Sequence, residues 1–395
     1  MELRRIDRFL LKGLYLLTAG IVVMQVLGQN RWTSLMFTMT FPFTVLLWLR
    51  TIRKTITGTD LVMLFTIALA VVSVLVDMEA NYGHLSFSYL KKVIMFSMTL
   101  LFFQTVYRLR IDGEMADFIQ LVIDCLIWYL MLMYFSQRLR MFTLNGMITQ
   151  YLTFRMSNPN LTGLYLACLY MLVLYRIFAQ EKFIWKVLHI GMSLFLAVCI
   201  LQTQSRNALL VIVTFTALCM WLVFRGRRNL HIGKIPAMLI STFPALFLTV
   251  YISVVYTPWI QKLFAFLVGE GKELDSRISI WVPALQRLGE SPIVGAYYAI
   301  SRGTGMSQMH NSHLDIAASY GIPVLLLVCL LLYGYLHQRG RRYADKQGYI
   351  YILGFACAII LGIGEAALFS GGLGLYVFAG AFLLLAGRRE PEESA

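Results

Sequence analysis

Long runs of apolar residues, separated by short polar segments, repeat along almost the whole chain. A helix needs about 20 apolar residues to span about 30 Å of hydrocarbon, and helices are expected because unpaired backbone groups are costly in lipid. The pattern predicts an all-α polytopic membrane protein with about 12 transmembrane helices, in which residues 1–395 form a single transmembrane domain. The expected helices are 9–28, 33–49, 60–77, 88–107, 117–135, 160–179, 183–202, 207–224, 235–255, 318–337, 348–368 and 371–387.

Two of these runs leave alternatives open. The first follows a basic N-terminal stretch, as in a signal peptide, but it is longer than the apolar region of a signal peptide and has no clear cleavage site of small residues. We therefore expect it to be retained as the first helix. The fourth run contains Lys91 and Lys92, which either extend to the outer face or line a polar cavity.

The positions of lysine and arginine predict the orientation of the helices, because cytoplasmic loops carry an excess of these residues. One set of alternate loops holds 22 of the 34, whereas the opposite set holds ten in much longer loops. We expect the first set and both termini to be cytoplasmic. The outer loop 136–159 and the large outer loop 256–317, between the ninth and tenth helices, then face outward from a plasma or inner membrane.

Composition excludes a soluble globular protein, because 59% of the residues are hydrophobic and only 14% are charged, against about 25% charged in soluble domains. The net charge of +14 is spread over short loops, so no nucleic-acid partner is expected. All six cysteines lie inside apolar runs and form no CxxC motif. This placement indicates buried apolar side chains and not disulfides or metal ligands.

The turn between the seventh and eighth helices, QTQSRN at 202–207, is expected to face outward. Arg206 lies there among amide and hydroxyl side chains, one of them Gln204. A single basic residue at a helix end is often only an interfacial anchor. The functional alternative is an anion site, because guanidinium forms bidentate, charge-assisted hydrogen bonds with phosphate.

The large outer loop contains an amphipathic segment from Asp275 to Leu288. Its apolar residues recur at helical spacing, at Ile278, Trp281, Leu285 and Leu288. This spacing predicts a short helix that lies in the plane of the membrane. Arg277 stands at its start, where helix amides also favour an anion; alternatively, Arg277 is a solvated loop charge paired with Glu273 or Asp275.

Four polar residues, His310, Asn311, His313 and Asp315, stand together directly before the tenth apolar run. Histidine accepts a proton near neutral pH, so His310 is a candidate general base. On a helix, His310 and His313 would share a face and offer two ligands to a metal ion. No third ligand is evident in the sequence, and we expect no metal and no other cofactor.

Glu365 lies in LGIGEAALFSGG, near the outer end of the eleventh run. Ionisable residues at such depth are candidates for function. The alternative is that Glu365 pairs with a buried basic residue purely for packing.

These motifs, taken in order, resemble those of a known family. They are Q-S-R-N-A at 204–208, R-I-S-I-W at 277–281, S-P-I-V-G at 291–295, and H-N-S-H-L-D at 310–315 followed by G-I-P at 321–323. The set is similar to that of the O-antigen ligase and polymerase family of bacterial envelope enzymes, over about residues 150 to 370. The segment Asn158–Gly163, which includes Asn160, also resembles the Pro-Asn that this family places before a helix.

The resemblance implies a polytopic glycosyltransferase with a GT-C-like helical fold. Family members take a glycan from a polyprenyl diphosphate carrier on the outer leaflet and pass it to an acceptor sugar hydroxyl, with inversion and without a metal. By the same resemblance, Arg206 and Arg277 bind the carrier diphosphate and His310 acts on the acceptor hydroxyl. The expected partners are the lipid-linked glycan, the growing polysaccharide and membrane lipid, with a flippase and a chain-length regulator as candidate protein partners.

Polymerases and ligases share these motifs. We favour a polymerase that elongates the repeat units of a capsule, exopolysaccharide or O-antigen, because the chain has no extra domain for another acceptor. A ligase is the first alternative. A 12-helix transporter or flippase fits the helix count, but transporters usually place polar residues at mid-membrane in two related halves, whereas here they concentrate at the outer end of the C-terminal part.

Overall fold

Every expected apolar run is helical over most of its length in the computed structural model, which confirms the all-α polytopic fold. Within the described residues, ten helices are long and apolar enough to cross a membrane, and two shorter apolar helices cover 348–363 and 375–385. The structure describes residues 3–388 except 54, 82–86, 137–141, 145–146, 150, 157, 180–181, 226–231, 255–256, 259–261, 263–274, 299, 301–308, 343–345, 367 and 370–373. Parts of the expected loop 256–317, including Glu273, and the tail 389–395 therefore lie outside the described residues.

The N-terminal part consists of five long helices and a short hairpin: α1 (Arg5–Leu27), α2 (Asn30–Ile52), α3 (Gly58–Asn81), α4 (Phe87–Arg108), α5 (Gly113–Phe135), β1 (Phe142–Leu144) and β2 (Met147–Thr149). The two strands pair antiparallel, with Phe142 opposite Thr149. The remainder is helical: α6 (Pro159–Ala179), α7 (Phe183–Thr203), α8 (Arg206–Arg225), α9 (Lys234–Val254), α11 (Asp275–Glu290), α13 (Ser312–Tyr320), α14 (Ile322–Arg342), α15 (Lys346–Ile360), the 3-10 turn η1 (Leu361–Ile363) and α16 (Leu375–Leu385).

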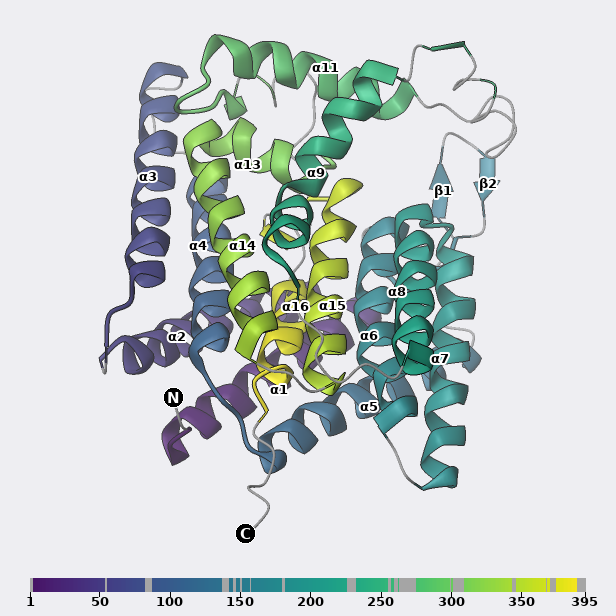
Figure 1. Ribbon diagram of the computed structural model, residues 1–395. Coiled ribbons are helices and arrows are strands. Elements are labelled where there is room, and N and C mark those ends of the chain that lie inside the picture. Colours follow the sequence, from purple (N-terminus) through teal and green to yellow (C-terminus); the bar gives the residue numbers. More distant parts are fainter. Residues whose placement is uncertain are drawn as a thin grey trace.

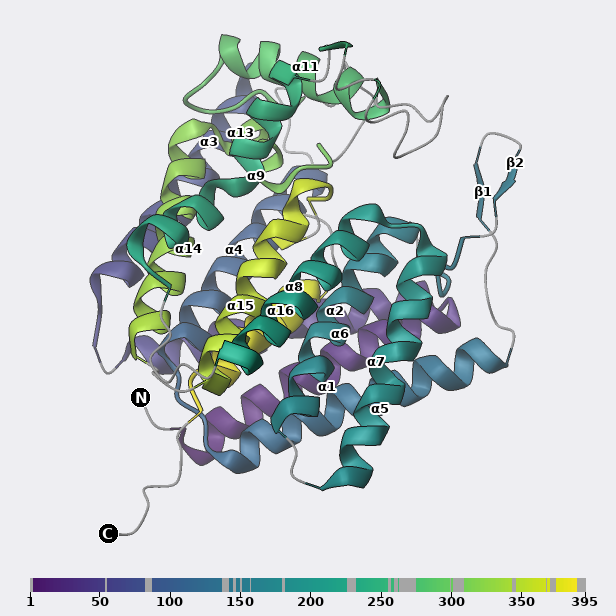
Figure 2. The same ribbon diagram turned by 45° about the vertical axis from the view of Figure 1, so that its right-hand side comes forward.

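The elements define two ends of the bundle (Figure 1). The start of α1 and the end of α16 lie at one end, whereas α11, β1 and β2 lie at the other (Figures 1 and 2). Ion pairs join helices at the first end, with Lys12 Nζ 3.0 Å from Glu114 Oε1 and Arg50 Nε 2.6 Å from Asp7 Oδ1. We name the first end inner and the second end outer, following the orientation expected from the basic loops.

Helix α15 lies at the centre and packs against α6, α8, α9, α14 and α16. The helices α3, α4, α9, α13 and α14 are on one side of it, and α5, α6, α7 and α8 are on the other (Figure 2). Every residue of α16 is buried. Its 11 residues extend only about 16 Å, so it reaches about half-way through a hydrocarbon layer of about 30 Å.

The tenth expected run, 318–337, is divided in the structure between α13 and α14. Gly321 separates them with φ +87°, which favours glycine. The segment before α13 crosses this junction, because Ala296 N donates to Ala318 O (2.9 Å) and Ile322 N donates to Pro292 O (2.8 Å). A Cβ on Gly321 would overlap the carbonyl oxygen of Ile293, so the S-P-I-V-G and G-I-P motifs together form one close backbone crossing.

The amphipathic segment forms α11, as expected, but its apolar side faces the protein. Ile278, Trp281 and Leu288 are buried, and only Leu285 of the predicted stripe is exposed, at 37%. Trp281 lies edge-on to Tyr251 of α9 and donates from Nε1 to Met309 O (2.7 Å). The short helix is thus confirmed, its apolar stripe is covered by the start of α13 and the outer end of α9, and its position in the plane of the membrane stays a prediction.

Candidate active site

Three side chains from separate segments meet at the outer end of α15. Glu365 follows η1, His310 precedes α13, and Arg277 lies in the first turn of α11. His310 Nδ1 is 3.0 Å from Glu365 Oε2, and Arg277 Nη2 is 3.5 Å from Glu365 Oε1. Glu365 is 7% exposed, whereas His310 is 24% and Arg277 is 33% exposed. Glu365 is therefore the most buried group of the cluster, whereas His310 and Arg277 are both partly exposed.

The carboxylate determines which histidine nitrogen carries the proton. An ionised carboxylate can only accept a hydrogen bond, so Nδ1 of His310 is the donor and Nε2 is left as the acceptor. No described residue forms a hydrogen bond with Nε2. The backbone of His310 has φ +49°, a left-handed conformation that is uncommon for a residue other than glycine and often marks a functional site.

Arg277 also holds the backbone of the site. Its guanidinium donates to the carbonyl of His310 (Nη1 to O, 3.2 Å) and to the carbonyl of Gly364. Burial lowers the pKa of Arg277, the nearby Glu365 opposes this change, and the positive charge of Arg206 lowers the pKa further. The last effect means that the two arginines, 71 positions apart in the sequence, lie close enough to repel each other.

Arg206 is the first residue of α8, and its side chain is exposed. Within the part of the chain that the structure describes, its guanidinium has no hydrogen bond or ion pair. The adjacent Asn207 donates from Nδ2 to Leu361 O (2.6 Å) and so fixes the start of α8 against η1. Asn207 was not among the residues predicted for the site, although it belongs to the Q-S-R-N-A motif.

The turn that presents Arg206 is built by two further motif segments. Gln204 caps α7 in the left-handed conformation, with φ +53°. At Gly163 of α6 a Cβ would come within 2.6 Å of Ser205 Cβ, so glycine allows α6 to approach the turn closely. Asn160 lies in the first turn of α6, where its N–H donates to Asn158 Oδ1 (2.7 Å). The Asn-Pro-Asn segment thus begins α6, the helix whose Gly163 lies against the turn.

Asn311 uses both ends of its amide to hold the site together. Its Oδ1 accepts from the amides of His313 and Leu314, each at 3.0 Å, and caps α13. Its Nδ2 donates to Pro244 O (2.9 Å) and Ile363 O (3.2 Å). The side chain is fully buried, so it joins α9, η1 and α13 directly beside His310.

His313 and Asp315 point away from the cluster of His310, Glu365 and Arg277. His313 is fully buried; its Nε2 donates to Ser241 O (2.7 Å), and its Nδ1 is 3.2 Å from Ser312 Oγ. Burial lowers the pKa of His313 to about 4, so the ring is neutral at physiological pH. His310 precedes α13, so the two histidines do not share a helical face. Within the described residues, no three His, Cys, Asp or Glu side chains form a metal-binding group.

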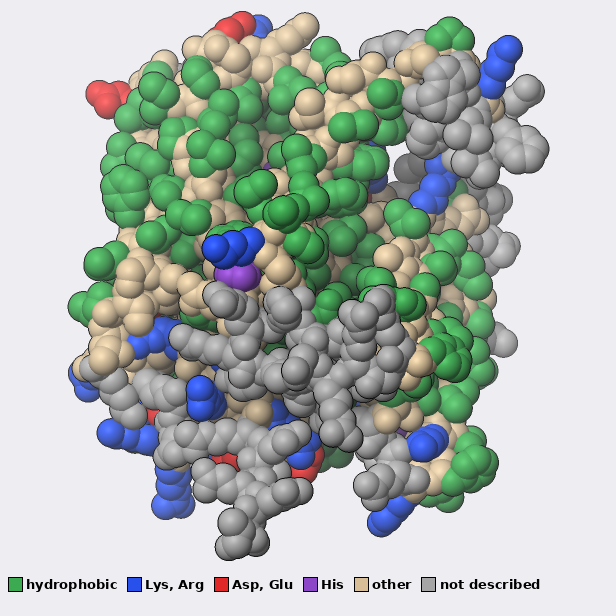
Figure 3. Space-filling model, viewed as in Figure 1, with side chains coloured by type: hydrophobic (Ala, Val, Ile, Leu, Met, Phe, Trp, Pro, Cys, Tyr) green, Lys and Arg blue, Asp and Glu red, His purple; other side chains and the backbone are tan. Residues whose placement is uncertain are grey.

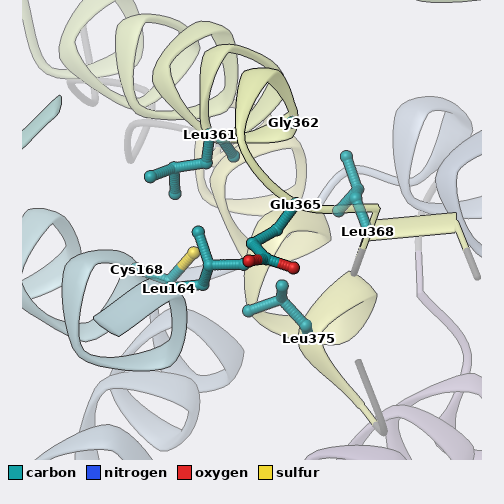
Figure 4. A pocket seen from close by; sticks show the side chains of 8 residues that line it. Leu164, Cys168, Leu361, Gly362, Glu365, Leu368 and Leu375 are labelled. Atoms are coloured by element: carbon teal, nitrogen blue, oxygen red, sulfur yellow. The ribbon is translucent and has the colours of Figure 1, made fainter. Parts of the chain in front are cut away.

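The surface at the outer end is hollowed. Figure 3 shows a recess between the outer end of α9 and the outer ends of the α6–α8 group, with Lys or Arg side chains at its wall. Beneath Glu365 lies a small cavity that would hold about one water molecule. Figure 4 shows the carboxylate of Glu365 between Leu164 of α6 and Leu375 of α16. The acid thus separates an exposed, cation-rich side from an apolar interior.

The fold and this site define a multi-pass membrane protein with a cationic polar site at its outer end. Residues 190–329 match the family described as O-antigen ligase. The match confirms the resemblance drawn from the motifs and supports the placement of the chain in the O-antigen ligase and polymerase family. A comparison with curated proteins gave no match. The matched segment contains Arg206, Arg277 and His310, and Glu365 lies beyond it.

Proposed function

We propose that the protein is an inverting, metal-independent glycosyltransferase that polymerises oligosaccharide units carried on a polyprenyl diphosphate. One observation carries the proposal: His310, held by Glu365, faces outward beside two arginines, one of which has no described partner. The O-antigen ligase match supports activity of this general type in polysaccharide synthesis. The sugar and the polymer, whether capsule, exopolysaccharide or O-antigen, belong to the proposal.

The reaction requires a base for the acceptor hydroxyl, which is a weak nucleophile. In the proposed step, the acceptor oxygen forms a bond to the anomeric carbon as the bond from that carbon to the carrier phosphate oxygen breaks. The hydroxyl proton passes to Nε2 of His310, and the diphosphate leaves with the bonding electrons. Attack from the side opposite the leaving group inverts the anomeric carbon. Glu365 keeps the proton on Nδ1 and stabilises the imidazolium that forms.

The leaving diphosphate needs positive charge, because negative charge develops on its oxygen as the bond breaks. Arg206 and Arg277 supply two guanidinium groups, each suited to bidentate contact with phosphate oxygens. Their proximity without an anion is unfavourable, as the effect of Arg206 on the pKa of Arg277 indicates. A bound diphosphate would relieve that repulsion, and this pair of cations would do the work that a divalent metal does in other transferases.

We place the site on the outer face of the plasma or inner membrane, with both termini in the cytoplasm. The carrier is then bound from the outer leaflet, and its prenyl chain lies in the surrounding lipid. A flippase that delivers the carrier and a regulator of chain length are the proposed protein partners. Loop 136–159 and loop 256–317 are the proposed contact regions for the growing polysaccharide.

The proposal is tested in cells that lack this protein and are complemented with the wild type or His310→Ala. Surface polysaccharide is separated on a gel, and the amount of each protein in the membrane is measured. We expect a ladder with the wild type and single repeat units with His310→Ala. A ladder in both would refute the role of His310. Complete polymer that stays on its carrier, unattached to its final acceptor, would favour a ligase, and lipid-linked units retained on the cytoplasmic face would favour a flippase.

A further inference from the structure

We propose that Lys92, an intramembrane lysine of α4, is a positioning residue for His310 and acts through Asp315 and the backbone of Met309. The inference rests on the proposed function of His310. Lys92 lies outside the segment that matches the family. The connection is visible only in the folded chain, where 223 positions separate Lys92 from its carboxylate partner.

Lys92 forms a buried ion pair with Asp315. Lys92 Nζ is 3.1 Å from Asp315 Oδ1, and the side chains are 10% and 2% exposed. The ammonium also lies 3.8 Å from the centre of the Tyr297 ring, a favourable cation–π arrangement. Lys92 therefore reaches neither the outer face nor an open cavity, but turns inward to the first turn of α13.

Asp315 uses the same oxygen to hold the backbone of Met309. Oδ1 also accepts from the amide of Met309 (3.1 Å). The carbonyl of Met309 accepts from Trp281 Nε1 (2.7 Å), so both polar backbone groups of this fully buried residue are held by side chains. The next residue is His310, whose own carbonyl accepts from Arg277. The left-handed backbone of His310 is thus held through Met309, by Asp315 and Trp281, and through its own carbonyl, by Arg277. Lys92 anchors the first of these three restraints.

Lys92 also supplies the positive charge that balances the Asp315 carboxylate. A lysine within a membrane-spanning helix is costly, and a buried ion pair often contributes less to stability than apolar residues of similar size. Removing only the lysine, however, would leave the Asp315 carboxylate buried without its counter-ion. Asp315 would then acquire a proton or draw in water, and its bond to Met309 would weaken. This links the lysine to the geometry of His310 and not only to the packing of α4.

The test compares purified Lys92→Met with Lys92→Met combined with Asp315→Asn, in the transfer reaction from lipid-linked glycan. Asparagine keeps an oxygen that accepts from Met309 but carries no charge. We expect Lys92→Met to reduce kcat about 10- to 100-fold with KM nearly unchanged, because base geometry enters the transition state more than substrate binding. The double variant should recover at least half of that loss on a logarithmic scale.

Arg108→Met is the matched control, because Arg108 forms a buried pair with Asp60 (2.7 Å) at the inner end. It should lower the melting temperature but leave kcat within about twofold of the wild type. If Lys92→Met lowers the melting temperature equally and leaves kcat unchanged, or if the double variant is no better than the single one, Lys92 is structural and the inference is overturned. His310→Ala separates the two proposals: an active His310→Ala variant refutes the base, whereas an inactive one together with an active Lys92→Met refutes only the positioning role.

Discussion

Glu365→Gln removes the negative charge of the site while it preserves the shape of the side chain. The carboxylate now accepts from His310 Nδ1 at 3.0 Å and from Arg277 Nη2 at 3.5 Å. The two donors contact different oxygens, Oε2 and Oε1. A carboxamide has an oxygen at one of these positions and an NH2 group at the other, so it can accept from only one of the two partners there. The oxygen is expected to turn toward the permanently charged Arg277. The NH2 group then donates to Nδ1 of His310, and the histidine proton moves to Nε2.

The size of the effect follows from that tautomer. With the proton on Nε2, His310 cannot accept a proton from the acceptor hydroxyl. General base catalysis typically contributes about 10²- to 10⁴-fold, and each tenfold change is about 1.4 kcal/mol of barrier. We expect kcat to fall about 10²- to 10³-fold, or about 3 to 4 kcal/mol. Arg277 keeps its bonds to the carbonyls of His310 and Gly364, so the fold and KM should change little.

The assay uses purified protein in lipid nanodiscs with a fluorescent glycan on a polyprenyl diphosphate, and initial rates are measured over a range of concentrations. Glu290→Gln is the matched control, because Glu290 is an exposed acid of α11 whose ion pair among the described residues is with Arg287, at 2.9 Å. It should retain the full rate. A rate for Glu365→Gln within about threefold of the wild type would show that the carboxylate does not determine the tautomer of His310 and would refute this role of Glu365.

Three further predictions concern the diphosphate site, the fold and pH. Arg206→Lys should reduce kcat/KM at least 100-fold, because a point charge lacks bidentate geometry. Arg287→Lys, the control, should leave kcat/KM unchanged. Equal kcat/KM of the two variants in the same assay would exclude the diphosphate role of Arg206. Gly321→Ala should prevent accumulation in membranes, because its Cβ would overlap Ile293 O. Gly334→Ala, whose Cβ would meet no described atom within 4 Å, should accumulate normally on a blot. Burial lowers the pKa of His313 to about 4, below its unfolded value of about 6.5. The free energy of unfolding should therefore decline by up to about 3 kcal/mol as pH falls from 6.5 toward 4. A melting temperature of His313→Gln with the same pH dependence as that of the wild type would contradict this.

The separation of His310 from His313 is a case in which local pattern was insufficient. Spaced three apart, the two histidines would share a face if both were helical. Asn311 caps α13 and places the start of the helix at Ser312. His310 therefore belongs to the preceding turn, and the two rings point to different neighbours. The capping capacity of asparagine is readable in a sequence, but the residue at which a short helix begins depends on what packs against it.

The partners of the charged residues were beyond the reach of sequence. Glu365 and Lys92 stand out in apolar runs as residues that need a reason. Nothing in their neighbourhood indicates that Glu365 meets His310 and Arg277, or that Lys92 meets Asp315. Such pairs join positions 55, 88 and 223 apart, and only the packing of α4, α11, α13 and α15 brings them together.

The sequence by itself determined that the chain is a multi-pass membrane protein, the approximate limits of its long helices, and the segments from which the site is drawn. It could do so because transfer of about 20 apolar residues into lipid is a local property that sums along the chain. Only the tertiary structure decided which polar residue is exposed at the site and which forms its hydrogen bonds inside the protein. His310 is partly exposed, whereas His313, Asn311 and Asp315 are buried. Burial and hydrogen bonding of a polar group depend on residues distant in sequence, and these become neighbours only when the helices pack.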